Sequence, residues 1–154
     1  DRPDPLMPHR SWLPGSRLKH RKGLTRRRGL RIGPSIRYGP VDRLFARYIV
    51  RRDQRCQYCG VEDGKRLEAA HMFGRGQKSV RYDPENVYAM HGGPSDRTCH
   101  HFLDTHTTEK HAWLKARLGE ARYTLLQFRA SHPKRPDLAL TKLWLLQELK
   151  RLEC

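Results

Sequence analysis

The ten residues 97–106, RTCHHFLDTH, hold five side chains that can bind a metal ion: one cysteine, three histidines and one aspartate. One ion cannot use all of them, because neighbouring residues on a helix point in different directions. Residues four apart, such as His100 and Asp104, share one helical face, whereas Cys99 and His101 flank His100 on either side. The segment must therefore be divided among structural, catalytic and surface roles.

A second pair of ligands stands earlier in the chain. Cys56 and Cys59 form a C-x-x-C pair that is followed directly by Gly60. In a basic chain without a secretory signal, such a pair is more typical of metal binding than of a disulfide. Two cysteines at this spacing can hold one zinc ion from a tight turn, which supplies half of a tetrahedral site. The other two ligands must come from later residues.

The composition indicates a small and strongly basic domain. The chain has 154 residues, 36% of them apolar, so the core should be small and dependent on a metal or another cross-link. Lys and Arg number 32 against 16 Asp and Glu, a formal net charge of +16, which favours a polyanionic partner such as nucleic acid. An acidic membrane surface is the competing partner. A membrane span is not expected, because the sequence contains no apolar run of about 18 residues.

The first 40 residues are predicted to form a basic extended arm. They contain eleven Lys and Arg against two Asp, together with many Pro and Gly. Such a segment is either a disordered, solubilising tail or a phosphate-binding arm, and both can hold at once. The run of Arg26, Arg27 and Arg28 is the candidate phosphate contact. Because the chain begins at Asp1 rather than Met, we expect a processed or trimmed N-terminus.

Hydrophobic spacing and turn residues predict the elements that position the ligands. The expected helices cover residues 41–52, 99 to about 105, about 107–118, about 120–130 and about 137–152, and the expected strands cover 66–73 and 86–90. Thr107 or Thr108 is expected to cap the third of these helices, and Gly119 to end it. No internal repeat is apparent.

Apolar residues predict the core faces of the later helices. Trp113, Ala116 and Leu118 are expected to face the core. The last helix carries a broad apolar face that would pack inside or meet another subunit, with core packing the preferred use: Leu138, Trp144, Leu145, Leu146, Leu149 and Leu152.

The order of these residues along the chain resembles that of the HNH endonucleases. The motif segments are CQYCG, LEAAHMFGRG, YDPENVYAMH and CHHFLDTH, within roughly residues 53–113. The chain is most similar to small phage-type members, and more loosely to NinG-like recombination nucleases. The resemblance implies an α+β fold with a small ββα-metal core. The expected division is an arm over 1–40, a nuclease core with its leading helix over 41–119, and C-terminal helices over 120–154.

The resemblance also implies a structural zinc site. Many members carry a second C-x-x-C pair after the asparagine, with a histidine directly after its last cysteine. Here His91 stands at the place of the third cysteine, and an insertion separates it from Cys99. The expected zinc ligands are Cys56, Cys59, His91 and Cys99. The alternative is that His91 is a loop histidine, with His101 or a water as the fourth ligand.

The same resemblance assigns the catalytic roles. His71 is expected to be the general base, and Asn86 to hold His71 or its loop, although Asn86 alone would be interpreted as a turn residue. His100 is expected to bind one catalytic Mg²⁺ or Mn²⁺ ion. Asp104 is either the second ligand of that ion or a surface acid on the same helical face.

One position departs from the family pattern. Many HNH enzymes carry an Asp or His metal ligand directly before the base, where this chain has Ala70. Glu68 is two residues earlier, on the same face of the expected strand, and is a candidate substitute. His101 and His106 receive no assignment.

We therefore expect a metal-dependent endonuclease that hydrolyses phosphodiester bonds of double-stranded or branched DNA in the cytoplasm of a bacterial or phage-infected cell. The loop GRGQKSVR follows the base, and its Arg75, Lys78 and Arg81 are expected to contact substrate, the alternative being a flexible basic loop. The competing function is a non-catalytic, zinc-stapled module that binds DNA or structured RNA. The oligomeric state and a possible partner protein stay open.

Overall fold

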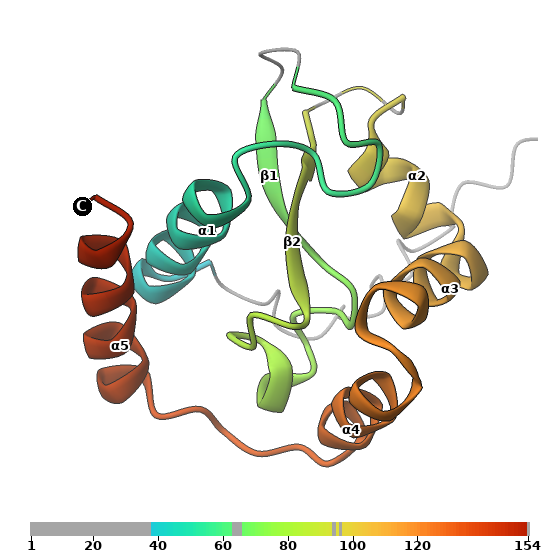
Figure 1. Cartoon of the computed structure of the whole chain (residues 1–154). Coiled ribbons are helices and arrows are strands. Elements are labelled where there is room, and N and C mark those ends of the chain that lie inside the picture. Colours follow the sequence, from blue (N-terminus) through green and yellow to red (C-terminus); the bar gives the residue numbers. More distant parts are fainter. Residues whose placement is uncertain (1–37, 63–65, 94, 96, 154) are drawn as a thin grey trace, which may run out of the picture. The chain divides into compact units, whose positions relative to one another are not determined.

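The computed structural model describes residues 38–62, 66–93, 95 and 97–153, which fall within one compact unit spanning 34–154. These residues form an α+β fold, as predicted, with five α-helices and a two-stranded sheet (Figure 1). The elements are α1 Pro40–Asp53, β1 Leu67–His71, the 3₁₀ helix η1 Lys78–Val80, β2 Val87–His91, α2 Cys99–Thr105, α3 Thr107–Leu118, α4 Glu120–Ser131 and α5 Leu138–Arg151. The predicted arm, with Arg26, Arg27 and Arg28, lies outside the described residues.

The two strands pair antiparallel and divide the molecule into two halves. Leu67 lies opposite His91 and His71 lies opposite Val87. In Figure 1, α1 and α5 lie on one side of this sheet and α2, α3 and α4 on the other. Because strand residues alternate between faces, Glu68 and Ala70 belong to the side of α2, while Ala69 and His71 belong to the side of α1.

Each side of the sheet has its own hydrophobic cluster. On the α1 side, α1 packs against the sheet and α5 packs against α1, and their cluster includes Phe45, Tyr48, Ile49, Val87, Ala89, Leu145 and Leu149. On the other side, α2, α3 and α4 each contribute residues to a cluster that includes Ala70, Tyr88, Met90, Leu103, Leu114, Leu126 and Ala130. All five residues of β2 are buried, so this strand is the shared wall of both clusters.

Several details differ from the sequence prediction. The N-cap of α3 is His106 rather than Thr107 or Thr108, because α2 ends only one residue earlier. Ala116 is exposed, and the inward positions of α3 are Lys110 and Leu114, with Trp113 and Leu118 packed at the edge. The strand predicted over 66–73 ends at His71, since Met72 and Phe73 turn into the following loop.

The last helix buries a narrower stripe than predicted. Leu145 and Leu149 are buried against α1, and Trp144 packs beside them. Leu138, Leu146 and Leu152 are between 45% and 51% exposed, because α5 rests mainly on one helix and offers only one side to it.

A buried ion pair ties α1 to the segment that precedes β2. Arg81 donates to both carboxylate oxygens of Asp42, from Nε to Oδ1 and from a terminal nitrogen to Oδ2, each at 2.8 Å. The side chains are 13% and 6% exposed. Burial alone would raise the pKa of Asp42, but the bonds from Arg81 and from the backbone N–H of Gly39 outweigh it and lower that pKa. Asp42 is therefore a buried carboxylate that depends on Arg81.

We predict that Arg81→Met lowers the free energy of unfolding by about 3–5 kcal/mol, because it leaves Asp42 buried and unpaired. Urea denaturation of the protein measures this. The control is Arg122→Met, which removes a 61% exposed partner of Glu85 and should cost about 1 kcal/mol or less. Equal stability of the two variants would show that the Asp42–Arg81 pair has no structural role.

Candidate metal centre and adjoining groove

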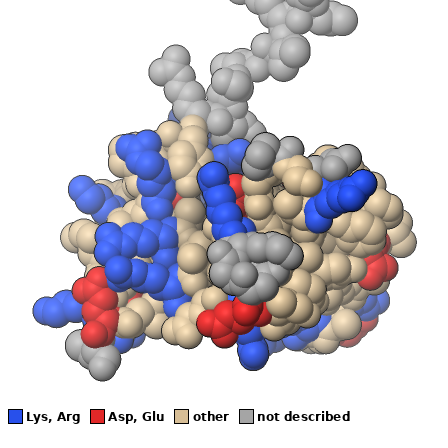
Figure 2. Space-filling view, turned by 90° about the horizontal axis from the view of Figure 1, so that it is seen from above, with Lys and Arg blue, Asp and Glu red and all other residues tan. Residues whose placement is uncertain are grey.

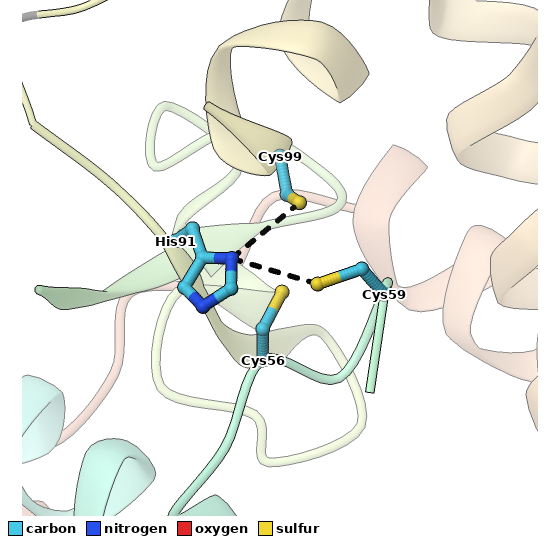
Figure 3. Close-up of side chains that lie close together, drawn as sticks. All are labelled: Cys56, Cys59, His91 and Cys99. Carbon is cyan, nitrogen blue, oxygen red and sulfur yellow. Dashed lines mark hydrogen bonds between the residues drawn. The ribbon is translucent and has the colours of Figure 1, made fainter. Parts of the chain in front are cut away.

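Three cysteines and one histidine converge at the edge of the sheet. The ligand atoms of Cys56, Cys59, His91 and Cys99 all lie within 4.8 Å of one another (Figure 3). Nδ1 of His91 is 3.5 Å from Sγ of Cys59 and 3.8 Å from Sγ of Cys99. Tetrahedral zinc, with bonds of about 2.3 Å to sulfur and about 2.0–2.1 Å to nitrogen, requires an S···N separation of roughly 3.5 Å. The group could therefore hold a zinc ion.

Three segments bring these ligands together. The turn after α1 carries Cys56 and Cys59, and it closes with Gly60, whose φ of 72° suits a residue without a Cβ. The N–H of Gln57 donates to the carbonyl of Ala89 at 2.9 Å, which docks this turn on β2. His91 is the last residue of β2 and Cys99 the first of α2, so one cation here would link α1, the sheet and α2.

The electrostatics of the group favour a cation. Burial would raise the pKa of Cys56, but backbone N–H groups of Cys59, His91 and Tyr58 outweigh it and lower that pKa. Burial, followed by the neighbouring Cys56 and Cys59, raises the pKa of Cys99 to about 12. Several thiolates this close together need a positive ion among them. His101, the alternative fourth ligand, is exposed and outside the group.

A groove of about 720 Å³ runs beside this centre, lined by α1, β1, α2 and α3. It brings together side chains that are far apart in the sequence. His71, His100 and Asp104, which were predicted as catalytic or metal-binding, all line it, as does Glu68. The groove is therefore the candidate reaction site.

His71 lies at the end of β1 with one ring nitrogen already bonded. Its Nε2 is 3.0 Å from the carbonyl oxygen of Arg81, which can only accept, so Nε2 carries the proton and Nδ1 keeps its lone pair. Burial of the ring, with Arg75 and Arg81 nearby, lowers the pKa of His71 to about 4. At neutral pH the side chain is an uncharged imidazole with a defined tautomer, which is the state that a proton acceptor requires.

Asn86 is fully buried and holds the loop that follows His71. Its amide oxygen accepts from the N–H of Phe73 at 2.7 Å, and its amide nitrogen donates to the carbonyls of Phe73 and Val80 at 2.9 Å each. The backbone N–H of Met72, the residue directly after His71, donates to the backbone carbonyl of Asn86 at 2.8 Å. Asn86 thus closes the loop between β1 and η1 without touching the groove.

His100 stands between two carboxylates. Its Nδ1 is 3.4 Å from Glu68, and its Nε2 is 3.4 Å from Asp104. The second oxygen of Asp104 accepts from Lys110, whose Nζ is 2.7 Å away. Among the described residues, only the Cys₃His group has three or more ligand atoms that all lie within 4.8 Å of one another, so the surroundings of His100 are a more open arrangement.

The predicted phosphate contacts fall into two kinds. Arg75 and Lys78 are exposed, and Arg75 lines the groove with its guanidinium 5.5 Å from the ring centre of Tyr38. Arg81 is instead engaged by Asp42, as described above, and its carbonyl holds His71. Arg47 also lines the groove, and its helix position is expected from the sequence to face water or phosphate. Arg66 and Lys110 line it as well, and sequence patterns predict no role for either side chain.

Basic side chains also gather over the α1–α5 half of the molecule (Figure 2). Figure 2 shows Lys and Arg concentrated on one side of the face it displays, above the α1–α5 half of the molecule. Arg47 and Arg51 of this half approach Glu153.

Within the described residues, no helix combines the length and the apolar character that crossing a membrane requires.

We predict one zinc ion per chain, held through His91 and not through His101. His91→Ala should lose the zinc, whereas the matched exposed variant His101→Ala should keep it. Metal content by mass spectrometry after gel filtration measures this.

Cys56→Ser should unfold the core, because metal binding and folding are coupled in a domain of this kind. If circular dichroism showed that the Cys56→Ser protein is folded although it contains no zinc, the arrangement of the four ligands would not depend on a bound ion.

We also predict that His71 takes up its proton near pH 4. Its folded pKa lies below the unfolded value of about 6.5, so the folded state is disfavoured by this group as the pH falls from about 6.5 towards 4, and the group has no effect above about 6.5. Proton–carbon NMR titration, with His71→Gln to assign the signal, measures this. Titration near pH 6.5 would mean that the ring is not buried in solution.

Comparison of the chain with family models, curated proteins and solved structures finds no match. The described geometry therefore stands on its own residues. It consists of an α+β fold with a Cys₃His group that could bind a metal ion, beside a groove lined by His71 and His100. This arrangement is compatible with a zinc-stapled ββα fold.

Proposed function

We propose that this protein is a metal-dependent endonuclease of the HNH type, with a structural zinc ion and one catalytic divalent ion. The observation that carries the proposal is that His71 and His100 line the same groove. His71 belongs to the α1 side of the sheet, and His100 comes from α2 on the other side. One side chain is suited to accept a proton and the other to bind a cation. Metal-assisted phosphodiester hydrolysis uses both.

His71 is the proposed general base. Its Nδ1 takes a proton from the attacking water, and the Arg81 carbonyl retains the proton on Nε2 and so fixes the ring. A pKa of about 4 keeps the free lone pair available at every physiological pH. A phosphate group bound in the groove is an anion, so it favours the charged imidazolium and makes His71 a stronger base when substrate is present.

His100, with a carboxylate beside it, is the proposed ligand of the catalytic Mg²⁺ or Mn²⁺. When bound, that cation would supply positive charge to the scissile phosphate and to the leaving 3′ oxygen. Asn86 has a positioning role, because the three hydrogen bonds of its side-chain amide fix the loop that begins directly after His71.

DNA, double-stranded or branched, is the proposed substrate. The net charge of +16 and the exposed Arg75 and Lys78 at or near the groove favour a polyphosphate. Arg81 is left out of the set of phosphate contacts, since its guanidinium is bonded to Asp42. Arg26, Arg27 and Arg28 remain proposed contacts of the arm.

A non-catalytic nucleic-acid-binding module is the second candidate function. The observation that favours it is Ala70, which is 1% exposed and offers no ligand at the position directly before His71. In that case the zinc group would be structural and the groove would bind phosphate without cutting. Matched-salt binding to duplex DNA and to structured RNA tells which nucleic acid such a module prefers.

We predict that the zinc-loaded protein nicks supercoiled plasmid when Mg²⁺ or Mn²⁺ is added, and that His71→Ala lowers the rate at least about 100-fold. The matched control His101→Ala changes an exposed histidine next to His100 and should cut normally. DNA affinity, measured by fluorescence anisotropy, should be unchanged in both variants. Tight, salt-sensitive binding without cleavage in any metal would favour the binding module instead.

A further inference from the structure

The side chain of Glu68 reaches from β1 across to α2. Its Oε2 lies 3.4 Å from Nδ1 of His100, and both side chains are partly buried, at 30% and 27% exposure. Two neighbouring ligands of an octahedral ion, with bonds of about 2.1 Å, are roughly 3 Å apart. A single divalent ion can therefore contact both atoms after a small adjustment of the side chains.

Asp104 lies at the same distance from the opposite nitrogen of His100 but has a different partner. Its second oxygen receives a 2.7 Å bond from Lys110, whose side chain is only 11% exposed. A fixed ammonium group beside Asp104 repels a divalent cation on that side of the ring. Glu68 has a cationic neighbour too, Arg66 at 3.2 Å, but that side chain is 74% exposed and can move into solvent.

Gly92 shows that the backbone leaves room for the Glu68 carboxylate. A Cβ at residue 92 would lie 2.3 Å from both Cδ and Oε2 of Glu68 and 2.4 Å from its Cγ. The N–H of Gly92 donates to the carbonyl of Arg66 at 2.9 Å, so the backbone of residue 92 is held against the start of β1. The path of the Glu68 side chain towards His100 therefore depends on residue 92 being glycine.

We propose that Glu68 is the carboxylate that binds the catalytic divalent ion together with Nδ1 of His100. This inference rests on the proposed function. Asp104 is then a positioning residue: its Oδ2, 3.4 Å from Nε2, would accept a hydrogen bond from Nε2–H, and Lys110 holds its other oxygen, which leaves the Nδ1 lone pair for the ion. Glu68 and Ala70 share one face of β1, so the acid supplies from two residues away the ligand that Ala70 cannot.

The test is Mn²⁺ binding to the full, zinc-loaded chain, measured by electron paramagnetic resonance of the free ion. Glu68→Gln should weaken binding about 100-fold or more, because it removes a ligand charge. Asp104→Asn should weaken it about 10-fold, within the range of residues that orient a ligand. Gly92→Ala should also weaken binding, since its Cβ displaces the Glu68 side chain. The control Glu120→Gln, at an exposed acid outside the groove, should bind like the parent protein.

The outcomes separate this inference from the proposed nuclease function. Zinc content is measured for every variant, so that a lost structural site is not mistaken for a lost Mn²⁺ ligand. Suppose that the parent protein cleaves DNA in a metal-dependent way. The role of Glu68 alone would then be overturned if Glu68→Gln left the Mn²⁺ affinity unchanged, or if Asp104→Asn lowered that affinity more than Glu68→Gln did. Absence of both Mn²⁺ binding and cleavage in the parent protein would overturn the nuclease and this inference together. His71→Ala should lose cleavage but keep Mn²⁺ affinity.

Discussion

The antiparallel pairing of β1 with β2 is the constraint on which the rest of the structure depends. A five-residue ladder sets which residues face α1 and which face α2. It therefore places His71 on one side and Glu68 on the other, although only two residues separate them. The same register puts His91 at the strand end, where the cysteine turn meets α2. A shift of one residue would exchange the two faces and separate all of these groups.

Polar groups hold the segments that the short sheet cannot reach. Asn86 closes the loop after His71, and the Asp42–Arg81 pair joins that region to α1. Asp53 accepts from Arg52 and from the backbone N–H of Ala89, which fastens the end of α1 to β2. Within the described residues every buried side-chain nitrogen and oxygen has a hydrogen-bond partner. The edge that carries the Cys₃His group and the groove thus rest on hydrogen-bonded loops as well as on hydrophobic packing.

Local patterns predicted the helices and the strands well, because hydrophobic spacing along the chain determines them, whereas the full Cys₃His group was predicted from the resemblance in motif order. Contacts between distant segments could not be predicted in this way. Arg81 was interpreted as a phosphate contact, since its partner Asp42 is 39 positions away. Glu68 meets His100 from 32 positions away, and only the fold shows that it reaches. Lys110 and the exposed leucines of α5 likewise depend on which side of a helix the neighbouring elements cover.

The narrow attachment of α5 has a consequence for how the molecule fluctuates. This helix is held mainly by α1, through Leu145 and Leu149, and supplies no residue to the metal group or the groove. Burial of two leucines is worth roughly 3–6 kcal/mol, which is less than the stability of most whole domains. We therefore expect α5 to undock as a separate cooperative unit, with hydrogen exchange faster than that of the central strands, while the side chains of the groove stay in place.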